Sequence, residues 1–205
     1  AIGEEKGAMT RVAACDVGDA AEALALLARA APTGVLHAAG VLHDKMLRSM
    51  ASDDVYAVFA PKALAASHVQ AIMTCKPLQA FGRVSSAAST FGNIGQANYA
   101  AANAHLDALA RARRCHGSLV SSLQIPAVSG SGMGATTFSK EQLDAIGAIS
   151  LDEFASWLAD GLTPALAAGQ RIQALLKSKL LDWMHADTLF ETPHGVVPTP
   201  TCEEE

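Results

Sequence analysis

The chain has 205 residues, which is enough for one domain with a hydrophobic core. Half of the residues are hydrophobic and only 17% are charged, and the abundance of alanine favours closely packed helices. Fifteen basic and twenty acidic residues give a net charge of -5, and no basic stripe stands out, which argues against nucleic acid as a partner.

The cysteine spacing and the hydropathy indicate in which cellular compartment the protein is expected. The four cysteines are scattered without CxxC or CxxH spacing, which argues against a zinc site and against a disulfide framework. No run reaches the ~20 apolar residues of a membrane span, and residues 1–10 lack the features of a signal peptide. We therefore expect no metal, no membrane partner and an intracellular, cytoplasmic protein. Because the chain begins at Ala1 rather than methionine, we interpret it as a piece of a longer protein.

Short β-rich runs alternate with helical runs along the chain. In chain order we expect a strand at 11–16, a helix at 19–31, a strand opening into a small-residue loop at 34–40, a helix at 52–73, a strand at 78–86, a helix at 97–114, a strand at 119–125, helices at 139–147 and 151–168, and a strand at 171–176. Ser52 is a plausible helix cap, and Pro61 predicts a kink or a break in the helix that contains it.

This alternation predicts βαβ units and an α/β fold with a parallel sheet flanked by helices. Ligands of such sheets bind beyond the carboxyl ends of the strands, where the sequence places Asp16, the segment 37–40 and Ser85-Ser86. The expected organisation is an N-terminal extension at 1–9, one α/β domain at 10–180, and a linker or disordered tail at 181–205, which is rich in Pro, Thr and Glu near its end.

One set of polar residues could converge at that edge of the sheet. Tyr99 and Asn103 are four positions apart and share one face of a helix, Ser86 ends the preceding strand, and Lys62 lies on the helix before it. A lysine ammonium lowers the pKa of a nearby phenol, and a serine hydroxyl can hold a carbonyl oxygen. This equipment suits delivery of a proton to a carbonyl that receives a hydride. From spacing alone, a packed tyrosine with one satisfied hydroxyl is the commoner interpretation.

Longer stretches resemble a known family. The segments HAAGVLHDKMLRSM, APKALAA, VSSAASTFGNIGQANYAAANAHLDALARARR and SGSGMG are similar to ketoreductase domains of modular type I polyketide synthases, in the short-chain dehydrogenase/reductase superfamily. The similarity extends from about residue 10 to about residue 176. Most reductases of the superfamily carry YxxxK, whereas this chain has Asn103 at the fourth position and Lys62 upstream, which is the polyketide arrangement.

The resemblance implies a catalytic tetrad of Lys62, Ser86, Tyr99 and Asn103. In that family Tyr99 would donate the proton, Ser86 would bind the substrate carbonyl, Lys62 would depress the pKa of Tyr99 and bind the nicotinamide ribose, and Asn103 would support the proton relay. The implied cofactor is NADPH. Besides Lys62 and Tyr99, its expected contacts are Asp16 and Val17 near the adenine and the loop His37, Ala38, Ala39 and Gly40 along the cofactor.

The resemblance also implies the substrate and the partners. The reaction would convert a β-ketoacyl thioester on the phosphopantetheine arm of an acyl carrier protein into a β-hydroxyacyl thioester, beside the other domains of a polyketide synthase. Leu42-His43-Asp44 keeps the last acid of a Leu-Asp-Asp motif that is found in many domains giving the D-hydroxy product. Phe91 replaces the tryptophan of the opposite class. The sequence therefore leans toward the D-hydroxy class.

Departures from the family leave an alternative open. No glycine-rich phosphate loop occurs before Asp16, so the fold looks N-terminally truncated, and an upstream ketoreductase segment would have to supply that loop. Without it, 11–16 and 34–40 would lack a bridging strand. Arg83 also interrupts a strand that is aliphatic in the family and is costly unless paired. The alternative is a catalytically incomplete scaffold or docking fragment. A free-standing small-molecule reductase is disfavoured because YxxxK is absent.

Four further features have functional interpretations, and the first three of them also have ordinary ones. His37 either contacts the cofactor or caps its own loop through a ring nitrogen, and His43 either lines a substrate groove or is simply an exposed loop residue. The arginines of 111–114 either dock an acidic carrier protein or complement the end of their helix. The glycine-rich loop at 129–134 is a candidate hinge for a substrate lid.

Overall fold

The structure is a computed structural model that describes residues 11–162, except for residues 75, 77, 116, 117, 119 and 146. All described residues belong to one of the two compact units of the chain, Ala1–Gln173. The expected strand at 171–176, the end of the helix expected at 151–168, and the domain limits at 1–9 and 181–205 lie outside the described residues.

Three parallel strands form the sheet in the order β1, β2, β3. They are β1 (Gly34–His37), β2 (Ala80–Ser86) and β3 (Val120–Ile125). Gly34 pairs with Ala80, and Phe81 pairs with Val120, so consecutive strands lie side by side and all run in the same direction. Because the connections between these strands carry helices, the chain is an α/β protein with a parallel sheet, as the sequence predicts.

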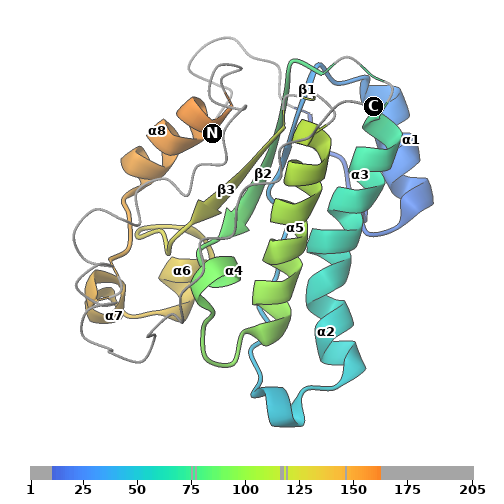
Figure 1. Ribbon diagram of the computed structural model, residues 1–205. Helices are drawn as coiled ribbons and strands as arrows, with labels where there is room; N and C mark the ends of the chain where they lie inside the picture. Colours follow the sequence, from blue (N-terminus) through green and yellow to red (C-terminus); the bar gives the residue numbers. More distant parts are fainter. Residues whose placement is uncertain are drawn as a thin grey trace, which may run out of the picture. The chain divides into compact units, whose positions relative to one another are not determined.

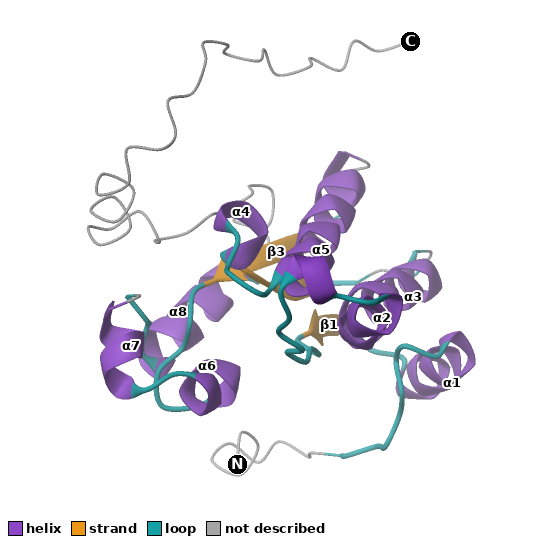
Figure 2. Cartoon of the chain, turned by 90° about the horizontal axis from the view of Figure 1, so that it is seen from below, coloured by secondary structure: helices purple, strands orange, loops and turns teal. Residues whose placement is uncertain are grey.

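The helices cover both faces of this sheet. They are α1 (Ala20–Ala30), η1 (Leu47–Ser49), α2 (Ser52–Phe59), the π-helical turn η2 (Ala60–Leu64), α3 (Ala65–Met73), α4 (Ala88–Phe91), α5 (Ala97–Cys115), α6 (Gly132–Thr137), α7 (Lys140–Ala145) and α8 (Leu151–Gly161). Figures 1 and 2 show α3 and α5 on one side of the strands and α8 on the other, with α1 packed against α3. Within the described residues, no helix is long and apolar enough to cross a membrane.

The main core lies between the sheet and the helices α1, α3 and α5. Its buried members are Leu27, Val69, Met73, Phe81, Ala110 and Val120. On the opposite face, α8 approaches closely because two glycines leave room for it. A Cβ added at Gly161 would lie 2.4 Å from Leu123 Cδ2, and one added at Gly82 would lie 2.5 Å from Leu162 Cδ2.

Three expectations about elements need correction. The segment 129–134, expected as a glycine-rich loop, is a loop only in part, because helix α6 begins at Gly132. Residues 11–16 form no strand, because a strand needs a neighbour for its backbone groups and none of the described strands pairs with this segment. Ser52 is the first residue of α2 rather than its cap. The exposed N–H at the start of that helix belongs to Ala51, and the Asp54 carboxylate accepts from it at 2.7 Å.

Pro61 changes the helix without ending it. The helix expected at 52–73 runs from Ser52 to Met73, and Pro61 lies in the π-helical turn η2 between α2 and α3. Proline has no N–H to donate and its ring crowds the preceding turn, and a local widening of the helix accommodates both effects. This wide turn contains Lys62.

Candidate active site

Three elements bring the four predicted catalytic residues together at the carboxyl edge of the sheet. Lys62 comes from η2, Ser86 from the end of β2, and Tyr99 and Asn103 from the first two turns of α5. Lys62 Nζ lies 5.4 Å from the centroid of the Tyr99 ring, and Asn103 Nδ2 donates to the Tyr99 carbonyl at 2.8 Å. The structure therefore places an ammonium, a phenol, a hydroxyl and an amide at the carboxyl edge of the sheet.

Lys62 is a buried cation held by backbone carbonyls. The residue is 2% exposed, and Nζ donates to Val84 O at 3.2 Å and to Ala39 O at 3.5 Å. Burial lowers the pKa of Lys62 to about 8, and the charge of Asp107 opposes this shift. Gly40 leaves space for the ammonium, because a Cβ at that position would lie 3.2 Å from Nζ.

Although Lys62 is expected from the sequence to lower it, the pKa of Tyr99 is raised. Burial raises its pKa, hydrogen bonding with Asn103 and Ser86 acts in the opposite direction, and the charge of Asp44 raises it further. The expected lowering by Lys62 is therefore not seen. The ammonium sits over the ring and is engaged with the carbonyls of Val84 and Ala39, while desolvation penalises the phenolate.

Asn103 carries an acceptor without a protein partner. The residue is fully buried, and its Nδ2 is bonded to Tyr99 O, but no described residue donates to its Oδ1. Buried polar atoms of this kind are almost always satisfied, so Oδ1 is suited to accept from a water molecule or a ligand group. Such a position fits the predicted part of Asn103 in a proton relay.

Ser86 ends β2 and begins the next turn of the chain. Its Oγ accepts the backbone N–H of Ala88 at 3.2 Å, which leaves the hydroxyl proton available to another acceptor. The adjacent Ser85 points to the opposite face of the strand, where it is buried and donates to Asn103 O at 3.3 Å. The first of the two serines therefore ties β2 to α5, and the second interacts with the Tyr99 phenol, where a ligand oxygen could share its hydroxyl proton.

The loop after β1 is fastened to the start of α5. Asn98 Nδ2 donates to the carbonyls of His43 and Asp54, both at 3.0 Å, and its Oδ1 accepts Tyr99 N at 2.8 Å. Gln96 Nε2 donates to Asp44 Oδ2 at 2.9 Å, and Lys45 N donates to the carbonyl of Gly95. The segment Leu42-His43-Asp44 is thus held beside Tyr99.

His43 and Lys45 share one carboxylate at the start of α2. His43 Nε2 lies 2.8 Å from Asp54 Oδ1, and Lys45 Nζ donates to Asp54 Oδ2 at 2.7 Å. The hydrogen bond from Lys45, followed by that from Ala51 N, lowers the pKa of Asp54 to about 2. The His43 side chain is half-exposed and bonded to this carboxylate. It is therefore more than a simple exposed loop residue, and the bond does not by itself place it in a substrate groove.

The predicted cofactor residues lie near the same edge, in different environments. His37 is buried, and its Nε2 bonds to the carbonyl of Lys62 at 2.8 Å; burial lowers its pKa. Asp16 is exposed and accepts Gly18 N at 2.8 Å, and a Cβ at Gly18 would lie 3.2 Å from the carbonyl of Ala60, next to η2. The half-buried members of the set are Val17, Ala39 and Gly40, whereas Ala38 is exposed.

The sequence-based interpretation missed Asp107. This residue is 3% exposed on α5, and its carboxylate is bonded by Ser89, Ser122 and Gln124. A signal was present, because Tyr99, Asn103 and Asp107 are spaced by four and share one helical face. Arg114, one of the arginines considered for docking, donates to Val120 O at 3.1 Å.

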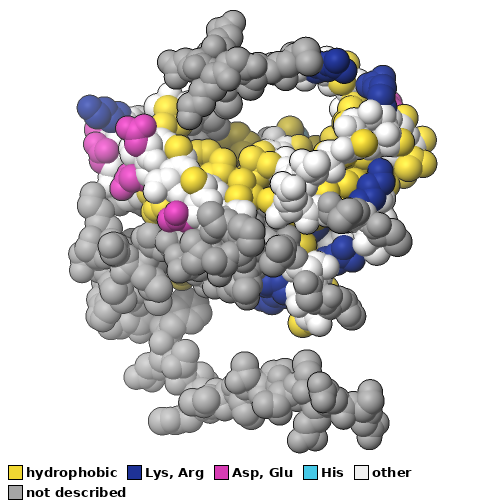
Figure 3. Space-filling view, turned by 90° about the horizontal axis from the view of Figure 1, so that it is seen from above, with side chains coloured by type: hydrophobic (Ala, Val, Ile, Leu, Met, Phe, Trp, Pro, Cys, Tyr) yellow, Lys and Arg dark blue, Asp and Glu magenta, His cyan; other side chains and the backbone are white. Residues whose placement is uncertain are grey.

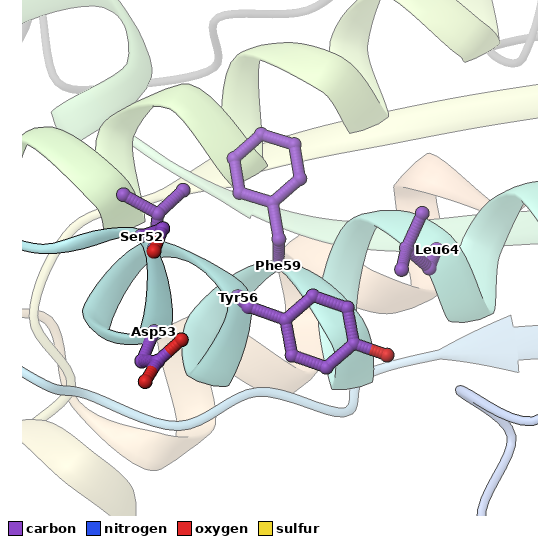
Figure 4. Close-up of a pocket in the computed structure, with 6 residues that line it drawn as sticks. Ser52, Asp53, Tyr56, Phe59 and Leu64 are labelled. Carbon is purple, nitrogen blue, oxygen red and sulfur yellow. The ribbon is translucent and has the colours of Figure 1, made fainter.

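The site does not coincide with the hollow on α2. A depression of about 560 Å³ is lined by Ser52, Asp53, Val55, Tyr56, Phe59 and Leu64, none of them a predicted site residue. Figure 4 shows these side chains along α2 and its continuation. Among the described residues, no group of three or more His, Cys, Asp or Glu could hold a metal ion.

The parallel sheet, the flanking helices and the tyrosine helix define a Rossmann-type fold of the short-chain dehydrogenase/reductase kind. The chain matches the KR domain over residues 3–130 and belongs to this family of ketoreductase domains.

Its relatives include large polyketide synthases. It is 47% identical over 124 residues to polyketide synthase GfsA of Streptomyces halstedii, a match that covers 58% of this chain and 2% of that protein. It is 40% identical over 155 residues to the mycoketide-CoA synthase of Mycobacterium tuberculosis, a match that covers 70% of this chain and 4% of that protein. The chain thus spans only a small fraction of the length of these relatives.

Solved ketoreductases have the same fold. The first ketoreductase of the tylosin polyketide synthase superposes with a TM-score of 0.68 at 35% identity, covering 74% of this chain and 34% of that one. An A1-type ketoreductase superposes with a TM-score of 0.70 at 30% identity, covering 88% and 42%. The chain therefore has the fold of the ketoreductase family over the matched residues.

Proposed function

We propose that this chain is the catalytic part of a ketoreductase that reduces a β-ketoacyl thioester, carried on an acyl carrier protein, to the β-hydroxyacyl thioester with NADPH. The observation that carries the proposal is the buried Lys62 ammonium, 5.4 Å from the centroid of the Tyr99 ring, beside an Asn103 Oδ1 that no described residue satisfies. Few structural roles need these three groups together.

Each residue has a distinct task in this reaction. Tyr99 holds the proton that the reduced oxygen receives, and its raised pKa keeps it protonated until then. Ser86 uses its free hydroxyl proton to hold the substrate carbonyl against the phenol. We assign to Lys62 the stabilisation of the phenolate that forms as the proton leaves, because its ammonium lies 5.4 Å from the ring centroid, although burial leaves the resting pKa of Tyr99 raised. Asn103 Oδ1 accepts from the water that returns a proton.

The residues present fit a nicotinamide cofactor at this edge. When bound, NADPH supplies the hydride. Lys62 would hold the ribose hydroxyls, and Asp16 and Val17 would lie near the adenine. The loop 37–40 would follow the cofactor, with His37 fixing η2 through the Lys62 carbonyl rather than reaching the ligand itself. An upstream segment with the glycine-rich loop would complete the phosphate site.

The product class follows from the loop beside Tyr99. Asp44 is fixed by Gln96, and the carbonyl of His43 is fixed by Asn98, so Leu42-His43-Asp44 presents one wall to a substrate that approaches the phenol. Phe91 is half-buried on α4. We infer the D-hydroxy product from the retained aspartate.

The experiment is a matched pair of tyrosine variants. Oxidation of NADPH is followed with a β-ketoacyl thioester surrogate, using the chain joined to the upstream segment. Tyr99→Phe should lower the rate by about 10²-fold or more, because the proton donor is lost, while NADPH binding is retained. Tyr56→Phe is the control, because Tyr56 is the other tyrosine of the chain and is 63% exposed on α2. Full activity of Tyr99→Phe would refute the assignment.

The second candidate is a scaffold without catalysis, which docks other polyketide synthase domains. It is favoured by one observation: residues 11–16 form no strand, and β1 pairs with β2 alone among the described strands. The same assay separates the two functions. A scaffold would show no NADPH oxidation in the wild-type chain, even with the upstream segment present.

A further inference from the structure

We propose that Asp107 is a positioning residue of the ketoreduction, one that holds the Ser86 turn (residues 86–92) against the tyrosine helix. The proposal rests on the proposed function, since it concerns the presentation of Ser86 to the substrate. Asp107 is two turns beyond Tyr99 on α5, and its role is to fix the segment that follows Ser86 rather than to touch the reacting atoms.

The Asp107 carboxylate is saturated by side-chain donors from two other elements. Its Oδ1 accepts from Ser122 Oγ at 2.6 Å, and its Oδ2 accepts from Gln124 Nε2 at 2.7 Å, both from β3. Ser89 Oγ, from α4, lies 2.8 Å from the same Oδ2. A buried carboxylate with only polar neutral donors is costly to keep, which indicates that these bonds do more than fill the core.

Two of these bonds lead to the Ser86 turn, one directly and one through Gln124. Ser89 Oγ lies 2.8 Å both from Asp107 Oδ2 and from the carbonyl of Ser86, and its single proton is shared between these two acceptors. This contact links the Ser86 turn to α5. The second route is indirect: Gln124 donates to Asp107, and its Oε1 accepts from Thr90 Oγ1 at 2.8 Å. The two carboxylate oxygens of Asp107 therefore have different functions. Oδ2 connects to the Ser86 turn through Ser89 and Gln124, whereas Oδ1 bonds only to Ser122 on β3.

The turn matters because Ser86 depends on it. The Ala88 N–H donates to Ser86 Oγ at 3.2 Å and thereby orients the hydroxyl, and Ala88 opens the short helix α4 that Ser89 and Thr90 anchor. An error of about 1 Å in a group that positions substrate costs about 10²-fold in rate. Loss of Asp107 should therefore reach the chemistry through Ser86.

Three variants separate this role from general destabilisation. Asp107→Asn keeps the shape but turns one acceptor into a donor that opposes Gln124, Ser89→Ala removes only the link to the turn, and Ser122→Ala removes only the bond at Oδ1. We expect Asp107→Asn to lower kcat by about tenfold or more with KM changed less than about twofold, and Ser89→Ala to do the same in part. Ser122→Ala should keep kcat near that of the wild type, whatever stability it loses.

Amide hydrogen exchange provides the readout that does not need activity. Residues 87–92 should exchange about tenfold faster or more in Asp107→Asn and in Ser89→Ala, and at the wild-type rate in Ser122→Ala. Unchanged exchange of the turn in Asp107→Asn, or equal loss of kcat and protection in Ser122→Ala, would overturn the proposal. If the wild type reduces no ketone, the proposed function fails, and the exchange data still decide whether Asp107 holds the turn.

Discussion

At the scale of single residues, the site depends on a cation kept out of water. Lys62 is 2% exposed, its ammonium contacts two backbone carbonyls, and burial lowers its pKa from 10.5 to about 8. An ammonium held in this way costs folding free energy, which a lysine with a purely structural role would avoid. The proposed function accounts for this cost through the position of the ammonium, 5.4 Å from the centroid of the Tyr99 ring.

This cost predicts a pH dependence for Lys62→Met. An unfolded lysine keeps its proton up to about pH 10.5, whereas the folded one releases it above about pH 8. Between these values the unfolded chain binds more protons, so the free energy of unfolding of the wild type should rise with pH relative to the variant. The rise should total about 3 kcal/mol, with the full penalty present below pH 8. Urea unfolding at several pH values measures this difference.

The comparison is restricted to the difference between the two proteins, because other groups also titrate in this range. The pKa of Tyr99 is raised in the folded protein, so above about pH 10 the unfolded chain releases this proton first and stability falls. Tyr99 is present in the wild type and in Lys62→Met, so both proteins share this loss. A matched control is Lys45→Met, because the Lys45 side chain is 39% exposed and so keeps much of its contact with water. A flat difference between wild type and Lys62→Met would contradict the buried-ammonium interpretation.

Side-chain spacing on one element was predictable, but contacts between elements were not. The four-residue spacing of Tyr99 and Asn103 indicates one face, and α5 places them there. The engagement of Lys62 with Val84 O and Ala39 O depends on the widened turn η2, and the partners of Asp107 come from α4 and β3. Both arrangements are set by tertiary packing, which spacing along the chain does not contain.

At the scale of elements, α5 is positioned through the side chain of Asn98. This residue is 2% exposed in the first turn of the helix, and its amide joins the helix to the loop after β1 and to α2. An element that must present Tyr99 at a fixed place needs such a fixed end. Asparagine suits the position because one amide carries two donors and an acceptor.

Asn98→Ala should therefore be strongly destabilising. The carbonyls of His43 and Asp54 and the N–H of Tyr99 would lose their side-chain partner in a buried site. We expect a loss of about 2 to 3 kcal/mol in the free energy of unfolding, measured by chemical denaturation. Asn93→Ala is the matched control, because Asn93 is exposed and makes one side-chain bond, to Gln96 at 3.1 Å. Equal effects of the two substitutions would contradict the anchoring role of Asn98.

Most of the described elements follow from local pattern, and one of the exceptions is informative. The three strands of the sheet and the long helix α5 appear where periodicity and composition predict them. Residues 11–16 have the β-rich composition of a strand, yet they form none, because strand formation depends on a neighbour whereas helix formation is satisfied within its own segment.

At the scale of the whole molecule, charge is distributed unevenly over the surface and the core. On the face seen in Figure 3, apolar side chains lie between a group of Asp and Glu on the left and most of the Lys and Arg on the right. Inside, a cation lies in the layer between the sheet and its helices: Arg83 is fully buried, and its pKa is lowered to about 10 by burial and by repulsion from Arg113 and Arg114.

The contacts of the Arg83 guanidinium offset only a small part of the free energy that its burial costs. Its guanidinium donates to Gln70 Oε1 at 2.7 Å and stacks 4.2 Å from the centroid of the Phe81 ring, while Nε and Nη1 have no partner among the described residues. The structure therefore gives Arg83 partial pairing and no anionic partner among the described residues, and the cost of burying it stays a prediction. Replacing a buried charge of this kind by an apolar side chain is commonly neutral or stabilising.

Arg83→Met should raise the free energy of unfolding by about 1 to 3 kcal/mol, because it removes the desolvation penalty and keeps an unbranched side chain in the core between α3 and α5. Gln70 is only half-buried, so its freed carbonyl oxygen can turn to water. Arg83→Lys is the matched control: it keeps the charge but loses the planar contact with Phe81, and it should lower stability. Thermal and urea unfolding of the wild type, Arg83→Met and Arg83→Lys measure these differences in the free energy of unfolding. A clear loss of stability in Arg83→Met would show that the guanidinium has a buried anionic or water partner that completes its hydrogen bonding.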